Sequence, residues 1–188
     1  ESVLRQSFTN FELIIWDDGS TDNSVEIASG YAQKDKRIKL IAAKHQGFSN
    51  SLKSAFSICS GKYIGCVDSD DIIAPTALAE TAKVLNNNPE IGLVYTDYLL
   101  IDKDNKILGK GSRCQIPYSK DRLLISFMTF HFRLMRKGVF EQAGGINENT
   151  GSVPDYDLCL RLSEITEVYH LKQPLYYYRQ HSGNMSQP

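Results

Sequence analysis

The sequence lacks three features that would each indicate a class of protein. No uninterrupted apolar run approaches the roughly 18 residues that a membrane-spanning helix needs. The 21 lysines and arginines are balanced by 22 aspartates and glutamates, so a net charge of −1 provides no basic field for nucleic acid. The four cysteines include no C-x-x-C pair and no zinc-like spacing. We therefore expect no membrane span, no nucleic-acid partner and no zinc site.

The cysteines indicate a reducing compartment. Cys59, Cys66 and Cys159 stand in apolar patterns, which favours buried reduced thiols over disulfides. No signal peptide is present at the start of the chain, which opens with Glu1. We therefore expect a cytoplasmic domain that begins inside a longer protein.

The first half of the chain alternates short apolar runs with segments of helical spacing. The 188 residues, of which 41% are hydrophobic, are enough for one domain with a sizeable core. Alternating strands and helices favour an α/β fold with a Rossmann-like, doubly wound and mostly parallel sheet. The expected strands are residues 12–16, 37–43, 63–67 and 92–100, the last in a hairpin, and the expected helices follow Thr21, Gly47 and Pro75.

The second half is less regular. Residues 113–132 match neither pattern clearly. The remaining patterns predict helices at 137–143 and 155–165 and two short strands at 167–171 and 175–180.

Acidic residues follow two of the expected strands directly: Asp17-Asp18, and the cluster Asp68, Asp70 and Asp71. In doubly wound sheets, ligands bind beyond the carboxyl ends of the strands. Hard divalent cations prefer oxygen ligands, so a D-x-D at such an end can bind Mg²⁺ or Mn²⁺ together with phosphate oxygens. Simpler structural roles also fit: an ordinary turn at Asp17-Asp18, and capping of the next helix by Asp71.

A third acidic motif, VPDYDLCLRL, opens the expected helix after Val153. Arg161 lies four residues after Asp157, so an ion pair within the helix accounts for these two residues. Asp155 has no such partner in the pattern. A carboxylate at a helix start can act as a general base if it faces a cleft.

These motifs, in this order, resemble family 2 of the glycosyltransferases, which have the GT-A fold. The matching segments are SVLRQSFTNFELIIWDDGSTDNS, QGFSNSLKSAFSICSGKYIGCVDSDD, FEQAGGINE, PDYDLCLRL and YRQHSGNMS. The resemblance implies one GT-A domain over residues 1–188 that lacks the family's first strand. It implies a nucleotide-sugar-binding half at 1–100 and an acceptor-binding half at 101–188, which holds a smaller antiparallel region.

The resemblance also implies an activity: inverting, metal-dependent sugar transfer from a nucleotide diphosphate sugar to an acceptor hydroxyl, in polysaccharide or glycoconjugate synthesis. The expected donor is a UDP-sugar and the expected acceptor a saccharide or a lipid-linked saccharide, which would bring the domain to the inner membrane surface. The implied roles are nucleotide binding for Asp17, Asp18, Gly47 and Asp68, catalysis for Asp155, Mn²⁺ or Mg²⁺ binding for Asp70, Asp68 and His181, and acceptor binding for Gly144, Gly145 and Asp157.

Other interpretations remain open from the sequence. A nucleotidyltransferase would also surround a nucleotide with carboxylates and magnesium, and an inactive sugar- or nucleotide-binding remnant could keep the same fold. His131, Arg133 and Arg136 suit either contacts to an acceptor or diphosphate, or a strand with alternating basic residues. His181 suits either the metal site or a free tail.

Overall fold

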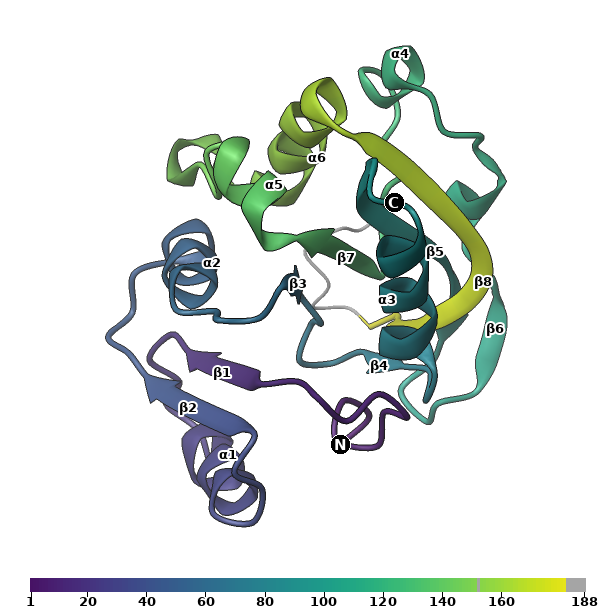
Figure 1. The fold of residues 1–188 in the computed structure, drawn as a ribbon. Helices are drawn as coiled ribbons and strands as arrows, with labels where there is room; N and C mark the ends of the chain where they lie inside the picture. The colour runs from purple at the N-terminus through teal and green to yellow at the C-terminus, as the bar shows by residue number, and fades with distance from the viewer. Residues whose placement is uncertain (152, 182–188) are drawn as a thin grey trace.

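A long central strand, β5 (Ile91–Ile101), organises the larger of two sheets in the computed structural model, which describes residues 1–151 and 153–181 (Figure 1). It pairs in parallel with β8 (Glu167–Arg179) and antiparallel with β7 (Arg133–Arg136). The strand order is β3-β7-β5-β8-β4, and β6 also pairs with β5. The remaining strands of this sheet are β3 (Tyr63–Gly65), β4 (Ile72–Ile73) and β6 (Ile107–Lys110).

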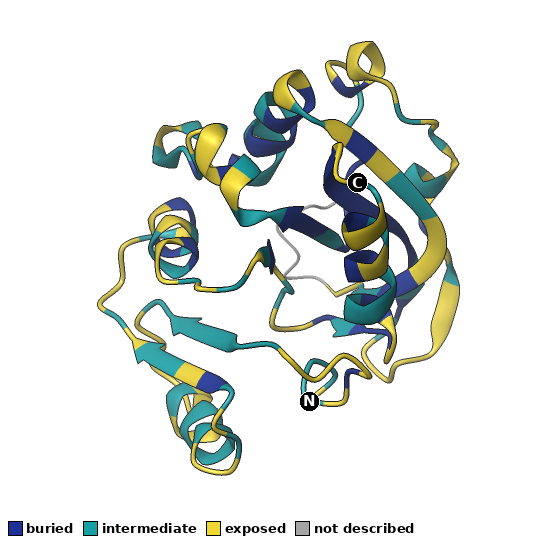
Figure 2. Cartoon of the chain, viewed as in Figure 1, coloured by how far each residue is buried: buried dark blue, intermediate teal, exposed yellow. Residues whose placement is uncertain are grey.

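A smaller unit lies beside this sheet (Figure 1). Strands β1 (Leu13–Asp17) and β2 (Ile38–Ala42) pair in parallel, and α1 (Ser24–Ala32) connects them. Ile38 is the one buried residue of these three elements, whereas eight consecutive residues of β5 are buried (Figure 2). The β1–β2–α1 unit is therefore much less enclosed than the larger sheet.

Helices cover both faces of β5, so its side chains are buried in either direction. Leu93 and Tyr95 pack in one core cluster with residues of α2 (Phe48–Ser57), α5 (Lys137–Gln142) and α6 (Pro154–Ile165). Val94 and Tyr98 pack in a second cluster with residues of α3 (Ala77–Asn87). The short helices are η1 (Ser112–Gln115), α4 (Lys120–Leu123) and η2 (Glu148–Thr150).

The α/β class predicted from the alternating patterns is confirmed. The expected single, mostly parallel sheet differs in detail: the described residues form two sheets, one with the parallel pair β1–β2 and a larger one in which one of five pairings is parallel and four are antiparallel. The additional antiparallel pairings come from β7 and β4, short strands that local patterns did not separate from their surroundings. The predicted hairpin is confirmed, with Asn105 at a positive φ of 66° in its turn.

The two short strands expected near the C-terminus form one strand, β8, which runs through Pro174. Pro174 lacks a backbone N–H and would be unfavourable inside a regular ladder. Here it stands where the pairing with β5 shifts register, between Leu171 opposite Thr96 and Tyr176 opposite Tyr98. The irregular pairing therefore accommodates the proline without ending the strand.

Candidate active site

The acidic motif that follows β3 forms a tight loop. Asp71 donates its backbone N–H to the Asp68 carbonyl at 3.1 Å, which closes the turn. Tyr176 of strand β8, whose side chain is fully buried, contacts this turn. The Tyr176 hydroxyl accepts a hydrogen bond from the Asp68 N–H at 3.2 Å and donates one to Asp71 Oδ2 at 2.7 Å.

Asp71 does not cap the following helix, contrary to the expectation from the sequence. Helix α3 begins at Ala77, and Thr76 occupies its N-cap position. Asp71 is buried instead, and its second carboxylate oxygen accepts the backbone N–H of Arg179 at 2.7 Å. Burial raises the pKa of Asp71 to about 6, although the bonds from Arg179 and Tyr176 oppose that rise.

Asp70 lies on the outer side of the loop and meets the end of β8. His181 Nε2 lies 2.8 Å from Asp70 Oδ2, and both side chains are about 40% exposed. The Arg179 Nε donates to the Asp70 carbonyl at 2.6 Å, and its other nitrogens bond Asn105 and the Asp102 carbonyl. His181 thus lies beside the D-x-D, and its role as a metal ligand stays a prediction; Arg179 connects that loop to the β5–β6 hairpin.

Asp68 faces a different partner, His131, whose Nε2 lies 3.6 Å from Asp68 Oδ2. The imidazole is 9% exposed and stacks on the Tyr176 ring, with centroids 4.6 Å apart. Burial, together with the charges of two nearby arginines, lowers the pKa of His131 well below its usual value. A ring with that pKa is neutral near pH 7.

The predicted metal ligands therefore divide between two neighbouring arrangements. Asp70 pairs with His181. The second arrangement is a cluster in which ligand atoms lie within 4.8 Å of one another, one from each of Asp68, Asp71 and His131. Carboxylate oxygens and imidazole nitrogens together suit a divalent ion such as Mn²⁺. The donor set of this loop fits the expected cation.

Asp155, the predicted base, stands in the first turn of α6 and is not free in the structure. Its Oδ2 accepts a hydrogen bond from Arg133 Nη2 at 3.0 Å, and its Oδ1 accepts the N–H of Tyr156 at 2.9 Å. Arg133 begins β7, next to the strand that leads into the acidic loop. His131, two residues before Arg133, lies 3.6 Å from Asp68, so this segment contacts both the candidate base and the D-x-D.

The predicted nucleotide-binding residues at the end of β1 form a second loop system. Asp18 accepts hydrogen bonds from the N–H groups of Gln46 and Gly47 at 2.9 and 3.0 Å. His45 Nδ1 lies 2.9 Å from the same carboxylate. Gly47 precedes α2 at a φ of 85°, a conformation that favours glycine. Asp18 thus fixes the position of Gly47.

Asp17 shapes its own turn. Its carboxylate accepts the N–H groups of Gly19 and Ser20, each at 3.1 Å. Hydrogen bonds from Ser20, first from its hydroxyl, lower the pKa of Asp17 below its usual value. The ordinary-turn interpretation therefore describes Asp17 in this structure, and its contact with a nucleotide remains a prediction.

The predicted acceptor-side residues are joined through Arg161. Asp157 Oδ2 accepts hydrogen bonds from Arg161 Nε and Nη2 at 2.9 and 2.6 Å, which confirms the expected ion pair within the helix. The same guanidinium donates to the Gly145 carbonyl at 2.7 Å and to the Ala143 carbonyl. Gly144 and Gly145 have φ of 86° and 66° and end α5, so Asp157 holds their turn indirectly.

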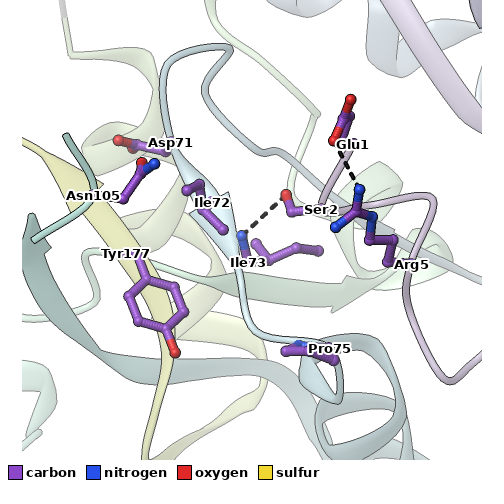
Figure 3. A pocket seen from close by; sticks show the side chains of 9 residues that line it. All are labelled: Glu1, Ser2, Arg5, Asp71, Ile72, Ile73, Pro75, Asn105 and Tyr177. Atoms are coloured by element: carbon purple, nitrogen blue, oxygen red, sulfur yellow. Dashed lines mark hydrogen bonds and ion pairs between the residues drawn. The ribbon is translucent and has the colours of Figure 1, made fainter. Parts of the chain in front are cut away.

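A cavity of about 440 Å³ lies on another side of the acidic loop (Figure 3). Asp71, Asn105 and Tyr177 line one side of it and the N-terminal residues Glu1, Ser2 and Arg5 the other, with β4 between them. None of the residues predicted to bind nucleotide, metal or acceptor lines it. We therefore do not assign this cavity to the donor.

Sequence reasoning missed the partners that hold the acidic residues. Tyr176 and Arg179 lie more than 100 residues from the loop, and the pairing of Arg133 with Asp155 spans 22 residues. Nothing in the spacing of the residues around Arg133, Tyr176 or Arg179 identifies a partner across the sheet. Only the strand order places them beside the carboxylates.

Comparison with known proteins identifies the class. The family model described as "Glycosyl transferase family 2" matches residues 1–144, which is most of the chain. The chain therefore belongs to glycosyl transferase family 2, as its motifs indicated. The sequence is 31% identical over 186 residues to the chondroitin synthase of Escherichia coli, and 28% identical to the hyaluronan synthase of Pasteurella multocida. Each alignment covers 99% of this chain. It covers 27% of the length of the chondroitin synthase and 19% of that of the hyaluronan synthase.

Solved structures confirm the GT-A fold. S. aureus TarS in complex with UDP-GlcNAc superposes with a TM-score of 0.75 over 97% of this chain and 54% of that one, at 20% identity. The mannosyltransferase PcManGT of Pyrobaculum calidifontis, in complex with GDP-Man and Mn²⁺, gives a TM-score of 0.70 over 94% and 50%, at 15% identity. At these identities the likeness concerns the fold.

Proposed function

We propose that this domain transfers a sugar from a nucleotide diphosphate sugar to an acceptor hydroxyl, with inversion at the anomeric carbon. The observation that carries the proposal is the position of the segment from His131 to Arg133: Arg133 bonds Asp155, and His131 lies 3.6 Å from Asp68. A candidate base and a candidate diphosphate-binding loop thereby share one site. Sugar transfer requires both groups, because the base takes the proton of the attacking acceptor while the loop holds the leaving diphosphate.

Asp155 would accept the proton of the acceptor hydroxyl as that oxygen attacks the sugar. Attack on the face opposite the leaving diphosphate inverts the centre in one step, and no covalent intermediate with the enzyme is needed. Because both Asp155 oxygens are held by hydrogen bonds, the carboxylate presents its remaining lone pairs in a fixed direction.

Asp70, His181 and Asp68 would hold Mn²⁺ or Mg²⁺. We favour Asp70 and His181 over Asp71, because both Asp71 oxygens already accept hydrogen bonds. When bound, such an ion supplies Lewis-acid stabilisation of the negative charge on the departing diphosphate. Asp18 and Gly47 would bind the nucleoside beside it.

The relatives narrow the substrates we propose. A UDP-sugar is favoured because TarS is solved with UDP-GlcNAc, and a saccharide acceptor because two relatives are named chondroitin and hyaluronan synthase. Among the described residues, no helix has both the length and the apolar character to cross a bilayer. A cytoplasmic location, contact with a lipid-linked acceptor, the division into donor and acceptor halves and the missing first strand all remain predictions.

The test begins with calorimetric titration of UDP, with and without Mn²⁺. Release of UDP from UDP-GlcNAc and other UDP-sugars is then measured with chondroitin and hyaluronan oligosaccharides as acceptors. We expect Mn²⁺-dependent binding and release, and a product anomer opposite to that of the donor by NMR. Asp155→Asn should reduce turnover about 100-fold or more while UDP affinity stays constant. Binding without release would favour the inactive remnant, and pyrophosphate release from UTP with a sugar phosphate would favour the nucleotidyltransferase.

A further inference from the structure

We propose that Arg133 is a positioning residue for sugar transfer, which acts on turnover by fixing the Asp155 carboxylate. The inference rests on the proposed function and adds a residue that contacts the base rather than the substrate. Arg133 stands at the start of β7, and Asp155 at the start of α6. The side chain therefore links the central sheet to the helix that carries the base.

The guanidinium of Arg133 is held from several directions. Its Nη2 donates to Asp155 Oδ2 at 3.0 Å, and its Nη1 donates to the Thr129 carbonyl at 3.0 Å. Its carbon lies 5.4 Å from the centroid of the Phe127 ring, and the side chain is 11% exposed. A buried, planar group with these contacts has little freedom to turn.

Asp155 is consequently held at both oxygens. Arg133 binds Oδ2, and the N–H of Tyr156 binds Oδ1 at 2.9 Å. The Tyr156 bond alone would leave the carboxylate able to tilt, because a single hydrogen bond tolerates a broad range of directions. The second bond restrains that motion, so the remaining lone pairs keep one orientation toward an attacking hydroxyl. Misplacement of a reacting group by about 1 Å can cost about 100-fold in rate.

The charge of Arg133 has a second consequence for the site. Asp155 and Asp68 both interact with this guanidinium, which offsets the repulsion between two acidic groups. A lysine would keep the charge but, as a point-like ammonium on a flexible stem, would not reproduce the two directed bonds to Asp155 and Thr129. Orientation and charge can therefore be separated by substitution.

Arg136, three residues further along the same strand, provides a matched control. Its guanidinium is also half-buried, but it donates to the carbonyls of Leu85 and Asn88 at the end of α3 and to that of Ile91, which begins β5. No carboxylate is among these partners. Substitution of Arg136 should lower stability through the α3 terminus without altering the base.

The experiment measures UDP release from UDP-GlcNAc with Mn²⁺ and the oligosaccharide acceptors named above, and the calorimetric affinity for UDP with Mn²⁺, in the full chain. We expect turnover to fall about 10-fold in Arg133→Lys, with UDP affinity changed less than twofold because the charge is kept, and about 100-fold in Arg133→Met. Arg136→Lys should keep turnover per folded molecule within twofold. Circular dichroism supplies the folded fraction for each variant, and Arg133→Lys carries the test if Arg133→Met does not fold.

A double-mutant cycle distinguishes action through Asp155 from action elsewhere. In an Asp155→Asn background, Arg133→Lys should cause no further loss of turnover. A further loss of about 10-fold in that background, a normal turnover in Arg133→Lys, or an equal loss of UDP affinity would each overturn the inference. If the wild-type chain releases no UDP from any UDP-sugar, the proposed function fails together with it, whereas normal wild-type turnover with unaffected Arg133 variants removes only the role of Arg133.

Discussion

His181 Nε2 lies 2.8 Å from Asp70 Oδ2, although 111 residues separate the two in the chain. The contact forms because β8 carries its C-terminal end past the acidic loop, where Tyr176 and Arg179 also bond the loop. An imidazole and a carboxylate that already meet can exchange their mutual hydrogen bond for a shared divalent cation.

This contact predicts the effect of removing the imidazole. His181→Gln should weaken UDP binding in the presence of Mn²⁺ by about 10-fold, because loss of one ligand or its support typically costs 10- to 100-fold in metal affinity. Binding of UDP without Mn²⁺ should not change. Titration calorimetry measures both affinities, and Asp104→Asn, an exposed acid of the hairpin turn, is the control. Equal affinities of wild type and His181→Gln at every Mn²⁺ concentration would remove His181 from the metal site.

Asp18→Ala should loosen the loop that carries Gly47. The substitution removes hydrogen bonds from the N–H groups of Gln46 and Gly47 and should lower the free energy of unfolding by about 1 kcal/mol. If the loop contacts the nucleoside, UDP affinity should fall both with and without Mn²⁺, which separates this residue from a metal ligand. Asp22→Ala is the control, since that exposed carboxylate accepts the N–H of the nearby Ser24. An unchanged UDP affinity would argue against a nucleoside contact by this loop.

Arg161→Met should destabilise the turn that ends α5. Asp157 would lose its ion pair, and the carbonyls of Ala143 and Gly145 would lose their donor. We expect the free energy of unfolding to fall by about 2–3 kcal/mol, as measured by urea denaturation, because hydrogen bonds to charged groups contribute about 1.5–3 kcal/mol each. Lys137→Met, which removes a looser pair with Glu141 at 3.7 Å, should change it by less than about 0.5 kcal/mol. Similar losses in both variants would contradict the role given to Arg161.

The lowered pKa of Glu12 predicts that the free energy of unfolding depends on pH, independently of the active site. Burial raises the pKa of Glu12, but bonds from Lys39 and Ser60 lower it more, to about 2 from 4.5. Because the folded state has the lower pKa, the stabilisation is complete above about pH 4.5 and is lost as the pH falls toward 2.

The corresponding variant is Glu12→Gln. It should lower the free energy of unfolding by about 1–2 kcal/mol at pH 7, a value reduced for solvent screening, and the difference from wild type should shrink between pH 4.5 and pH 2. Urea denaturation at each pH measures the difference, with Glu26→Gln in α1 as control. A difference that stays constant from pH 7 to pH 3 would show that Glu12 is not the source.

Local sequence patterns correctly predicted those elements whose structure depends on residues close together in the chain. Helix α6 follows from its proline and the acidic residues of its first turn, and the β5–β6 hairpin follows from its turn residues. The acidic motifs at Asp17 and Asp68 were recognisable because each directly follows an apolar strand. Their roles in binding and catalysis, in contrast, were implied by the family resemblance and stay predictions.

The supporting partners depend on strand order, which a local pattern does not contain. Arg133 reaches Asp155 because β7 lies between β3 and β5, yet β7 is four residues long and its burial does not alternate in a distinctive way. Asp71 was assigned to a helix cap because acidic residues often begin helices, but burial against Tyr176 determined its role. Tertiary packing overrode the local preference in that case.

The parallel pairing of β5 with β8 determines when the chain can complete its core during synthesis. Leu93 pairs with Val168 and Tyr98 with Tyr176, so about 75 residues must be made between the two partners. A nascent chain that ends before β8 leaves one edge of its central strand open and its acidic loop without support from Tyr176. Closure of such a long segment is slow compared with local helix formation. On the ribosome, the loop that we propose binds the diphosphate would therefore be ordered only after Arg179 has left the exit tunnel.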